Sequence, residues 1–204
     1  MTVAATPTSL NQAQREAVEH GEGPLLVLAG AGSGKTRVLT ARIARLVERG
    51  IARADQVLAV TFTNKAAREM RDRVSRQLGY EPRGMWIGTF HAIGARIVRA
   101  NAALVGRTPS YTIYDQDDTL AVVKRLMDRH RVSTKAWAPR LVSATISDAR
   151  NAMVTPAEYE TLALTPLAKA IVPIYKDWDA AFTDANAVSF DDLLWLPVSL
   201  LRAN

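Results

Sequence analysis

The feature that most constrains this chain is a glycine-rich segment at residues 29–36, Ala-Gly-Ala-Gly-Ser-Gly-Lys-Thr. Phosphate groups need converging backbone N–H donors, and glycines let the backbone turn tightly enough to supply them. An uninterrupted apolar run at residues 24–29 leads into the segment, and apolar residues at helical spacing follow it. A strand, a loop and a helix in this order are the setting in which such a loop binds phosphates. We therefore predict a site for ATP or a close relative.

Residues of this loop have separate expected roles. Lys35 is expected to reach the β- and γ-phosphates as a point charge, and the Thr36 hydroxyl is expected to bind Mg²⁺ together with the nucleotide. These two residues are also the catalytic candidates. The usual motif begins with glycine, whereas this chain has alanine at that position. The rest of the phosphate cradle is expected to come from Ala29, Gly30, Ala31, Gly32, Ser33 and Gly34.

Apolar periodicity predicts two different halves. The first half alternates helices with strands at 24–29, 56–62 and 85–88, which indicates a parallel sheet with helices on both faces. A short strand is expected at 111–114, and only helical patterns follow it. We therefore expect a nucleotide-binding core over residues 1–110 and a helical part over 111–204. The expected helices cover residues 11–20, a stretch ending at Gly50, 64–78, 89–104, 116–131, 137–151, 156–162, 167–185 and 189–201, the last interrupted or ended early by Pro197.

Charge and composition narrow the possible partners. Residues 1–107 hold 16 Lys/Arg and 8 Asp/Glu, a net charge of +8, whereas residues 108–204 hold 10 and 12, a net charge of −2. A basic half beside a phosphate loop favours a polyanion, although solvated helix faces explain such charge equally well. The chain has no cysteine and no apolar run of about 18 residues, so we expect no disulfide and no membrane partner. Residues 1–9 read as a frayed leader, and a cytoplasmic location is expected.

Four further segments stand in a fixed order around the loop. They are Leu10-Asn11 with Gln14 and Ala17-Val18, residues 61–67 (Thr-Phe-Thr-Asn-Lys-Ala-Ala), residues 88–91 (Gly-Thr-Phe-His) and residues 189–194 (Ser-Phe-Asp-Asp-Leu-Leu). Together with the loop, this set resembles the superfamily 1A DNA helicases of the UvrD/Rep/PcrA group, over about residues 10 to 194, and alanine at position 29 is usual in that group. The resemblance implies an α/β fold: a P-loop NTPase (RecA-like) parallel sheet core, here incomplete, with an α-helical insert subdomain.

The resemblance also implies an activity. It points to the N-terminal part of an ATP-dependent 3′-5′ DNA helicase of repair or replication, using ATP and Mg²⁺ on single-stranded DNA and single-strand/double-strand junctions. In the group, an Asp-Glu pair and a second nucleotide-binding domain follow further along the chain, so we expect this piece to lack efficient ATPase and unwinding. Two alternatives stay open: a nucleotide- or DNA-binding module without turnover, and a phosphate-loop protein that is not a helicase.

The resemblance assigns two residues to the nucleotide base. Gln14 would read the adenine edge, because an amide can donate and accept at once. Arg37 would pack near the base or the sugar, where a guanidinium can stack. The competing interpretations are a solvated helix residue for Gln14 and a surface arginine for Arg37.

Five residues are implied to contact DNA. Phe62 would stack on a base, while Thr63 and Asn64 would face a phosphate where a strand ends and a helix begins. Thr89 and His91, at a second turn from a strand into a helix, would contact the DNA backbone or bases. The competing interpretations are a core phenylalanine for Phe62, a helix cap for Asn64 and a core or surface residue for His91.

Two acidic clusters are expected to be structural. The aspartates at 115, 117 and 118 are expected to cap a helix rather than to bind a metal. Asp191 and Asp192 follow a short apolar run, as acidic residues do at the end of a Walker B strand, but Ser189 before them favours a helix cap. The four tryptophans are expected to pack in the interior rather than to form a stacking platform.

Overall fold

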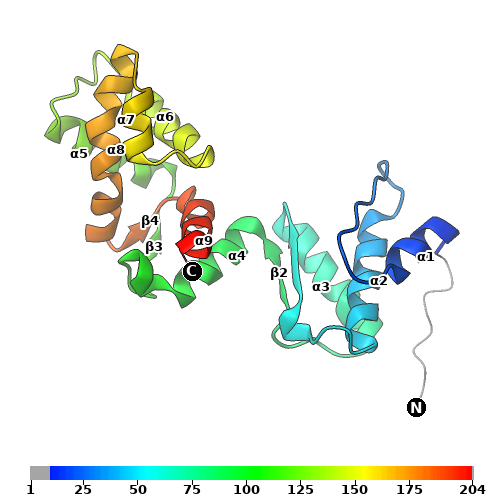
Figure 1. Ribbon diagram of the computed structural model, residues 1–204. Helices are drawn as coiled ribbons and strands as arrows, with labels where there is room; N and C mark the ends of the chain where they lie inside the picture. The colour runs from blue at the N-terminus through cyan, green and yellow to red at the C-terminus, as the bar shows by residue number, and fades with distance from the viewer. Residues whose placement is uncertain (1–9, 204) are drawn as a thin grey trace. The chain divides into compact units, whose positions relative to one another are not determined.

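The computed structural model describes residues 10–203, so the expectation of a frayed leader over residues 1–9 lies outside the described residues. The chain divides into two compact units, Met1–Ile93 and Gly94–Asn204. Both combine helices with a short two-stranded parallel sheet, which confirms a mixed α/β fold (Figure 1). The predicted domain boundary at residue 110 stays a prediction. No helix in the described range is long and apolar enough to cross a membrane.

The sheet of the first unit joins two strands of four residues. Strand β1, Leu58–Thr61, runs parallel to β2, Trp86–Thr89, with Leu58 opposite Trp86 and Thr61 opposite Thr89. Met70 and Val74 of the connecting helix pack on this sheet with Ile43, Ala59 and Ile87. The other elements are α1 (Gln12–Glu19), α2 (Lys35–Glu48), the 3₁₀ turn η1 (Ala54–Gln56), α3 (Asn64–Leu78) and the start of α4 (Phe90–Ala100).

The expectation of a buried strand at residues 24–29 is wrong. The segment belongs to no strand, and Leu26 and Leu28 are 82% and 86% exposed. A strand is buried on both faces only when neighbouring strands satisfy its backbone groups and helices cover it. The described residues give this unit only β1 and β2 as strands, and neither pairs with the segment. The predicted sheet of three strands is therefore a sheet of two.

Local signals place α3 at the predicted residues, Asn64–Leu78. The Thr63 hydroxyl accepts a hydrogen bond from the backbone N–H of Ala66 at 3.1 Å, so Thr63 is the N-cap and Asn64 is the first helical residue. The interpretation of Asn64 as the cap is therefore wrong by one position. Gly79 ends the helix with φ of 77°, in the left-handed region that favours glycine.

The second unit is a helical block beside a sheet of two strands, each two residues long. Apolar residues of α5, α6 and α8 form its main core, which includes Val123, Ile146 and Trp178. The expected cap at residues 115–118 is confirmed as a capping box, and Thr155 and Thr165 cap helices that begin with proline. The elements are η2 (Ala102–Val105), β3 (Thr112–Ile113), α5 (Gln116–Arg129), α6 (Pro139–Asn151), α7 (Pro156–Leu162), α8 (Pro166–Asp184), β4 (Ala187–Val188) and α9 (Asp192–Ala203).

Strand β4 differs from the expectation that only helical patterns, and no strand, follow residue 115. It runs parallel to β3, with Thr112 opposite Ala187. The buried guanidinium of Arg107 donates to the carbonyl of Ala187 at 3.0 Å, and the Thr108 N–H donates to Asn186 Oδ1 at 2.9 Å. A strand of two residues has no readable periodicity, and its partner lies far away in the sequence, so the pattern could not reveal it.

Helix α9 continues through Pro197, contrary to the expectation that this proline would interrupt the helix or end it early. Proline has no N–H to give to the carbonyl four residues before it, which is that of Leu193. Gly94 of α4 faces this carbonyl closely: a Cβ placed on Gly94 would lie 1.8 Å from Leu193 O and 3.3 Å from Pro197 Cγ. The missing side chain of Gly94 therefore makes room for α9.

A buried ion pair joins α6 to the start of α9. The side chains of Arg150 and Asp192 are 0% and 1% exposed and form a direct hydrogen-bonded pair. Arg150 also donates to Asp179 at 3.2 Å and lies 4.9 Å from the ring centroid of Trp195. Burial lowers the pKa of the Arg150 guanidinium, but the carboxylates of Asp192 and Asp179 outweigh this effect and raise it above its ordinary value.

Asp192 therefore has a structural role. Its carboxylate accepts the Ser189 N–H at 2.7 Å, and the Ser189 hydroxyl accepts the Asp192 N–H at 3.2 Å. This reciprocal pair closes the turn that leads into α9, so Asp191 and Asp192 lie in a turn and at a helix start and not in a strand. The described residues contain no cluster of His, Asp and Glu suited to a metal ion. Trp178 and Trp195 are buried, as expected for packing residues.

Candidate nucleotide and nucleic-acid site

The glycine-rich loop folds as a tight turn into α2. Gly32 and Gly34 have φ of 74° and 87°, which only glycine adopts without strain. The Ser33 hydroxyl donates to the carbonyl of Gly30 at 2.7 Å and closes the turn. Helix α2 begins at Lys35, so its unpaired N–H groups and its positive dipole end face the loop. The loop is therefore suited to an anion.

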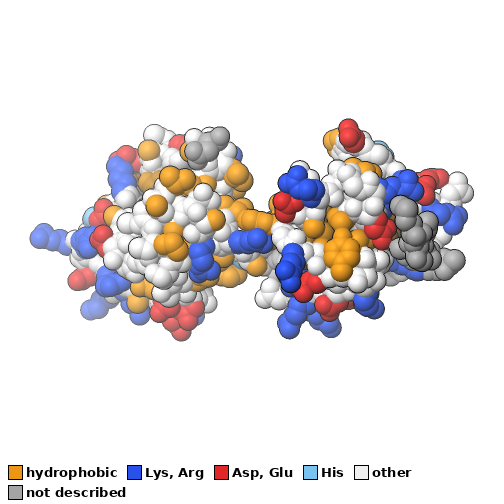
Figure 2. All heavy atoms as spheres, turned by 90° about the horizontal axis from the view of Figure 1, so that it is seen from below, with side chains coloured by type: hydrophobic (Ala, Val, Ile, Leu, Met, Phe, Trp, Pro, Cys, Tyr) orange, Lys and Arg blue, Asp and Glu red, His pale blue; other side chains and the backbone are white. Residues whose placement is uncertain are grey.

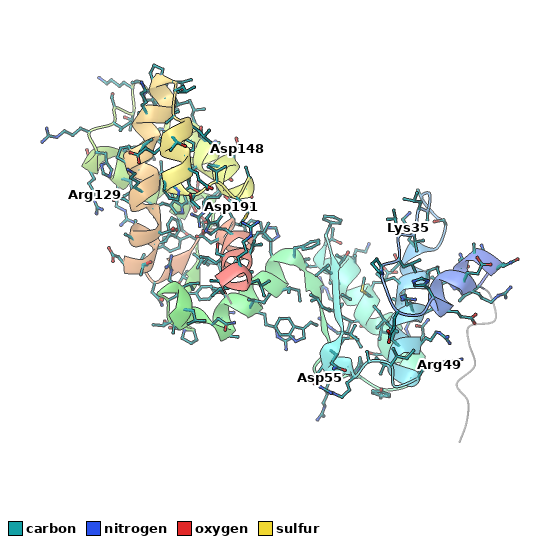
Figure 3. The ribbon with its side chains drawn as sticks, in the orientation of Figure 1. Lys35, Arg49, Asp55, Arg129, Asp148 and Asp191 are labelled. Atoms are coloured by element: carbon teal, nitrogen blue, oxygen red, sulfur yellow. The ribbon has the colours of Figure 1, made fainter. Side chains whose placement is uncertain are left out.

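Lys35 lies at the start of α2 with its ammonium group against the loop (Figure 3). Its Nζ donates to the carbonyls of Ala29 at 3.0 Å and Gly30 at 2.6 Å. A phosphate would offer this cation charged acceptors in place of neutral ones. Thr36 is exposed on the first turn of α2, and Arg37 beside it is half-buried. The predicted phosphate-binding residues are thus together in space.

Gln14 reaches this loop from α1. Its Oε1 accepts the Asn11 N–H at 3.0 Å, which completes a capping box, and its Nε2 donates to the Ser33 carbonyl at 2.9 Å. These two bonds fix the orientation of the amide. The amide oxygen can accept one more hydrogen bond through its second lone pair, and the nitrogen can donate one more through its second hydrogen. Gln14 can therefore still offer one donor and one acceptor to a ligand.

A second group of predicted residues lies where β1 and β2 end. Phe62 follows β1 and is 88% exposed, so the interpretation of Phe62 as a core residue is wrong. Phe90, also exposed, follows β2, and the two ring centroids are 5.8 Å apart with the planes tilted by 50°. Sequence reasoning missed the role of Phe90 in this pair. The sequence alone carries no signal for it, because the alignment of Thr61 with Thr89 is set by the register of the folded sheet.

The other predicted contacts differ in accessibility. Thr63 and Asn64 are exposed at the N-terminus of α3, where backbone N–H groups point outward. Thr89 is buried, and its hydroxyl accepts the Ala92 N–H at 3.2 Å, which stabilises the turn into α4. His91 is half-buried on α4. Of these four residues, Thr63 and Asn64 are fully accessible to a ligand, His91 is partly accessible and Thr89 is not.

A shallow pocket of about 330 Å³ lies between α3 and the end of β2. Arg71 donates to the carbonyl of Ile87 at 2.7 Å, which holds its guanidinium at the pocket wall. Arg68 and Arg71 were not among the predicted residues. Their spacing from Asn64, four and then three positions, places all three on one face of the helix and could have revealed them. The pocket is lined by Asn64, Ala67, Arg68, Arg71, Ile87, Gly88 and Ala92.

Charge on the visible faces is mixed. Figure 2 shows basic and acidic side chains interspersed on the two units from one side, with no continuous basic stripe on that face. Net charge alone therefore does not locate a polyanion on this face. The local arrangement at the strand ends, with two exposed rings beside a pocket lined by two arginines, is more specific.

A loop built for phosphates and exposed aromatic rings at strand ends are together typical of ATP-dependent proteins that act on nucleic acids. The chain matches the model of the UvrD/REP helicase N-terminal domain over residues 10–204. The chain therefore belongs to this family.

Curated relatives are similar along the same stretch. The ATP-dependent DNA helicase PcrA of Leuconostoc citreum is 39% identical over 204 residues, which cover 100% of this chain and 27% of that protein. PcrA of Staphylococcus aureus (strain Mu50 / ATCC 700699) is 39% identical over 193 residues, covering 95% of this chain and 26% of that protein. The ATP-dependent DNA helicase UvrD1 of Mycobacterium bovis is 43% identical over 201 residues, covering 95% of this chain and 26% of that protein. The chain thus spans about a quarter of their length.

Proposed function

We propose that this chain is the ATP- and single-stranded-DNA-binding N-terminal part of an ATP-dependent 3′-5′ DNA helicase of repair or replication. One observation carries the proposal: Gln14, a residue able to read a base edge, is hydrogen-bonded to the phosphate loop itself, through the Ser33 carbonyl at 2.9 Å. Base recognition and phosphate recognition are thereby joined. The relatives, named as ATP-dependent DNA helicases, support the same proposal.

In the nucleotide site, Lys35 would exchange its two carbonyl partners for phosphate oxygens, while N–H groups of the loop and of α2 bind the same anion. Gln14 would give its free N–H and lone pair to adenine, and Arg37 would pack beside the base or sugar. The exposed Thr36 hydroxyl fits a Mg²⁺ ion held with the nucleotide, since Mg²⁺ prefers oxygen ligands. Bound there, Mg²⁺ would neutralise phosphate charge.

In the DNA site, bases would stack on Phe62 and Phe90, while Thr63 and Asn64 present a hydroxyl, an amide and helix N–H groups to a phosphate. Arg68 and Arg71 would add charge at the pocket. Thr89 would act by stabilising the turn, and His91 would contact the backbone or a base. This surface suits an unpaired strand, because stacking requires bases that are not already paired.

The finer architecture belongs to the same proposal. A P-loop NTPase (RecA-like) core over residues 1–110 with a helical insert over 111–204 agrees with the family match. Binding at single-strand/double-strand junctions and a cytoplasmic location also stay proposals.

A second candidate function is a nucleotide- or DNA-binding module without turnover. It is favoured by the exposure of Leu26 and Leu28, 82% and 86%, in the segment that leads into the loop. Phosphoryl transfer depends on groups held rigidly in place. A loop whose preceding segment is not fixed in a sheet can still bind phosphate, but it does not hold the reacting groups rigidly enough for phosphoryl transfer.

Nucleotide binding is tested by titrating the chain with a fluorescent ATP analogue in the presence of Mg²⁺. Lys35→Ala should weaken binding by about tenfold or more, the loss expected when a charged hydrogen bond is removed. Arg49→Ala is the matched control, because Arg49 is exposed at the far end of α2. An unchanged affinity in Lys35→Ala, or no nucleotide binding by the wild type, contradicts the nucleotide site.

DNA binding is tested by fluorescence anisotropy with a labelled oligothymidine over a series of salt concentrations. Phe62→Ala should weaken binding by about fivefold or more, since stacking on one base contributes about 1–3 kcal/mol. Tyr80→Ala, an exposed aromatic residue away from the strand ends, should have little effect. Binding that does not weaken with salt contradicts phosphate contacts and favours a phosphate-loop protein of another kind.

ATP hydrolysis with and without single-stranded DNA tests the module. Turnover that DNA stimulates and Lys35→Ala abolishes refutes a module without turnover and supports a catalytic chain. Binding of both ligands without turnover fits the module and also the proposed N-terminal part, which is expected to lack efficient ATPase. Absence of both nucleotide binding and DNA binding refutes both candidates.

A further inference from the structure

The helix that carries Gln14 is short and needs support from outside. Helix α1 has eight residues and no basic residue in its last turn. Isolated helices of this length are marginal in water. Its apolar side is held by α2, where Leu10 and Val18 pack with Val38 and Ala41. This contact buries one face but leaves the carbonyls at the end of α1 to be satisfied in another way.

Arg42 of α2 satisfies one carbonyl of the last turn of α1 and the two carbonyls that directly follow the helix. Its Nη1 donates to the carbonyls of Ala17 at 3.1 Å and His20 at 2.7 Å, and its Nη2 donates to the carbonyl of Gly21 at 3.2 Å. The half-buried guanidinium thus lies at the negative end of the α1 dipole and places a cation where it is most favourable. Its planar group of donors reaches three carbonyls at once, which a lysine cannot match.

The same helix carries Lys35, seven residues before Arg42. Seven residues are about two turns, so both side chains lie on the same side of α2. Gln14 closes the connection from α1 back to the loop through the Ser33 carbonyl. A Cβ placed on Gly34 would lie 3.0 Å from Gln14 Nε2, which shows how closely the amide approaches the loop. Arg42 therefore holds α1 in place, and α1 in turn positions the side-chain amide of Gln14.

We infer that Arg42 is a positioning residue for base selection at the nucleotide site, acting through α1 on Gln14. This inference rests on the proposed nucleotide site. It predicts a particular division of labour: Lys35 and the loop determine how tightly a triphosphate binds, whereas Arg42 and Gln14 determine which base is accepted.

The test compares fluorescent ATP, fluorescent GTP and unlabelled tripolyphosphate as ligands of the 204-residue chain. Arg42→Ala should lower the ratio of ATP affinity to GTP affinity by about tenfold, the size expected when a two-bond contact with a base edge is lost. Its affinity for tripolyphosphate, which has no base, should stay within about twofold of wild type, because Lys35 is untouched. Arg42→Lys should give an intermediate ratio.

Gln14→Ala combined with Arg42→Ala distinguishes action through Gln14 from an independent effect. The double variant should show the same ATP-to-GTP ratio as Gln14→Ala alone. Arg49→Ala is the control on the same helix and should match wild type. If Arg42→Ala is unfolded by circular dichroism, Arg42→Lys is used in its place in the cycle.

The outcomes separate this inference from the proposed function. A wild-type chain that binds no nucleotide refutes the proposed site. A wild type that binds ATP through Lys35 and prefers it to GTP, together with an Arg42 variant of unchanged preference, refutes the inference alone. An equal loss for ATP, GTP and tripolyphosphate also refutes it, because the effect would then lie in the loop.

Discussion

Replacing Asp192 by asparagine should strongly destabilise the second unit. The change keeps the size of the side chain but leaves the buried guanidinium of Arg150 without its main partner. Removing one partner of a buried ion pair costs about 3–5 kcal/mol of unfolding free energy. Arg150 would keep the half-exposed carboxylate of Asp179 at 3.2 Å and the ring of Trp195. We therefore expect the lower end of that range, about 3 kcal/mol.

The assay is guanidinium unfolding followed by tryptophan fluorescence. Trp178 and Trp195 lie beside Arg150, with ring centroids 6.0 and 4.9 Å from its guanidinium carbon, so their emission reports on this region. Asp184→Asn, at the exposed end of α8, is the control and should change the unfolding free energy by less than about 0.5 kcal/mol.

A double variant shows whether the cost comes from the unpaired charge. Arg150→Met with Asp192→Leu removes both charges and should recover at least half of the loss, because apolar replacement of a buried pair is often neutral. An Asp192→Asn chain as stable as the Asp184→Asn control would refute the reasoning. A double variant no more stable than Asp192→Asn would do the same.

Two further predictions concern the second unit. Gly94→Ala should destabilise it by about 1–3 kcal/mol in the same assay, because the new Cβ would lie 1.8 Å from Leu193 O; Gly21→Ala, with open space around it, is the control, and equal effects would contradict the close approach. Burial raises the pKa of Tyr175 from 10.0 to about 12, so its neutral phenol contributes stability that is complete below pH 10 and is lost as pH rises to about 12. This loss is roughly 2–3 kcal/mol. In thermal melts between pH 9 and 12, the melting temperature of Tyr175→Phe should fall less steeply with pH than that of wild type. Identical declines of the two melting temperatures would contradict the role of the neutral phenol.

Local features of this fold could be predicted from the sequence because their causes are local. A threonine followed by a proline marks the starts of α7 and α8, and glycine marks the end of α3. The loop at residues 29–36 has its expected turn and leads into a helix at Lys35. In each case, the determining contact lies within about four residues of the position it explains.

Features that depend on distant partners could not be predicted. The apolar run at residues 24–29 has the composition of a buried strand, yet burial depends on strands placed beside it. Arg150 and Asp192 look like ordinary surface charges in the sequence, although they are buried against each other 42 positions apart. The exposed pair of Phe62 and Phe90 likewise depends on strand alignment, which single-strand periodicity does not contain.

The pairing of β3 with β4 has a consequence for how the second unit folds. Thr108 and Asn186, which flank the two strands, are hydrogen-bonded although they are 78 residues apart. Closing so long a loop costs chain entropy before any contact repays it, whereas the helices between them form from near neighbours. We therefore expect the helical block to become compact first and to bring the two strand segments together. Because the chain enters and leaves the block at one place, its length can also change between relatives without moving the strands at its base.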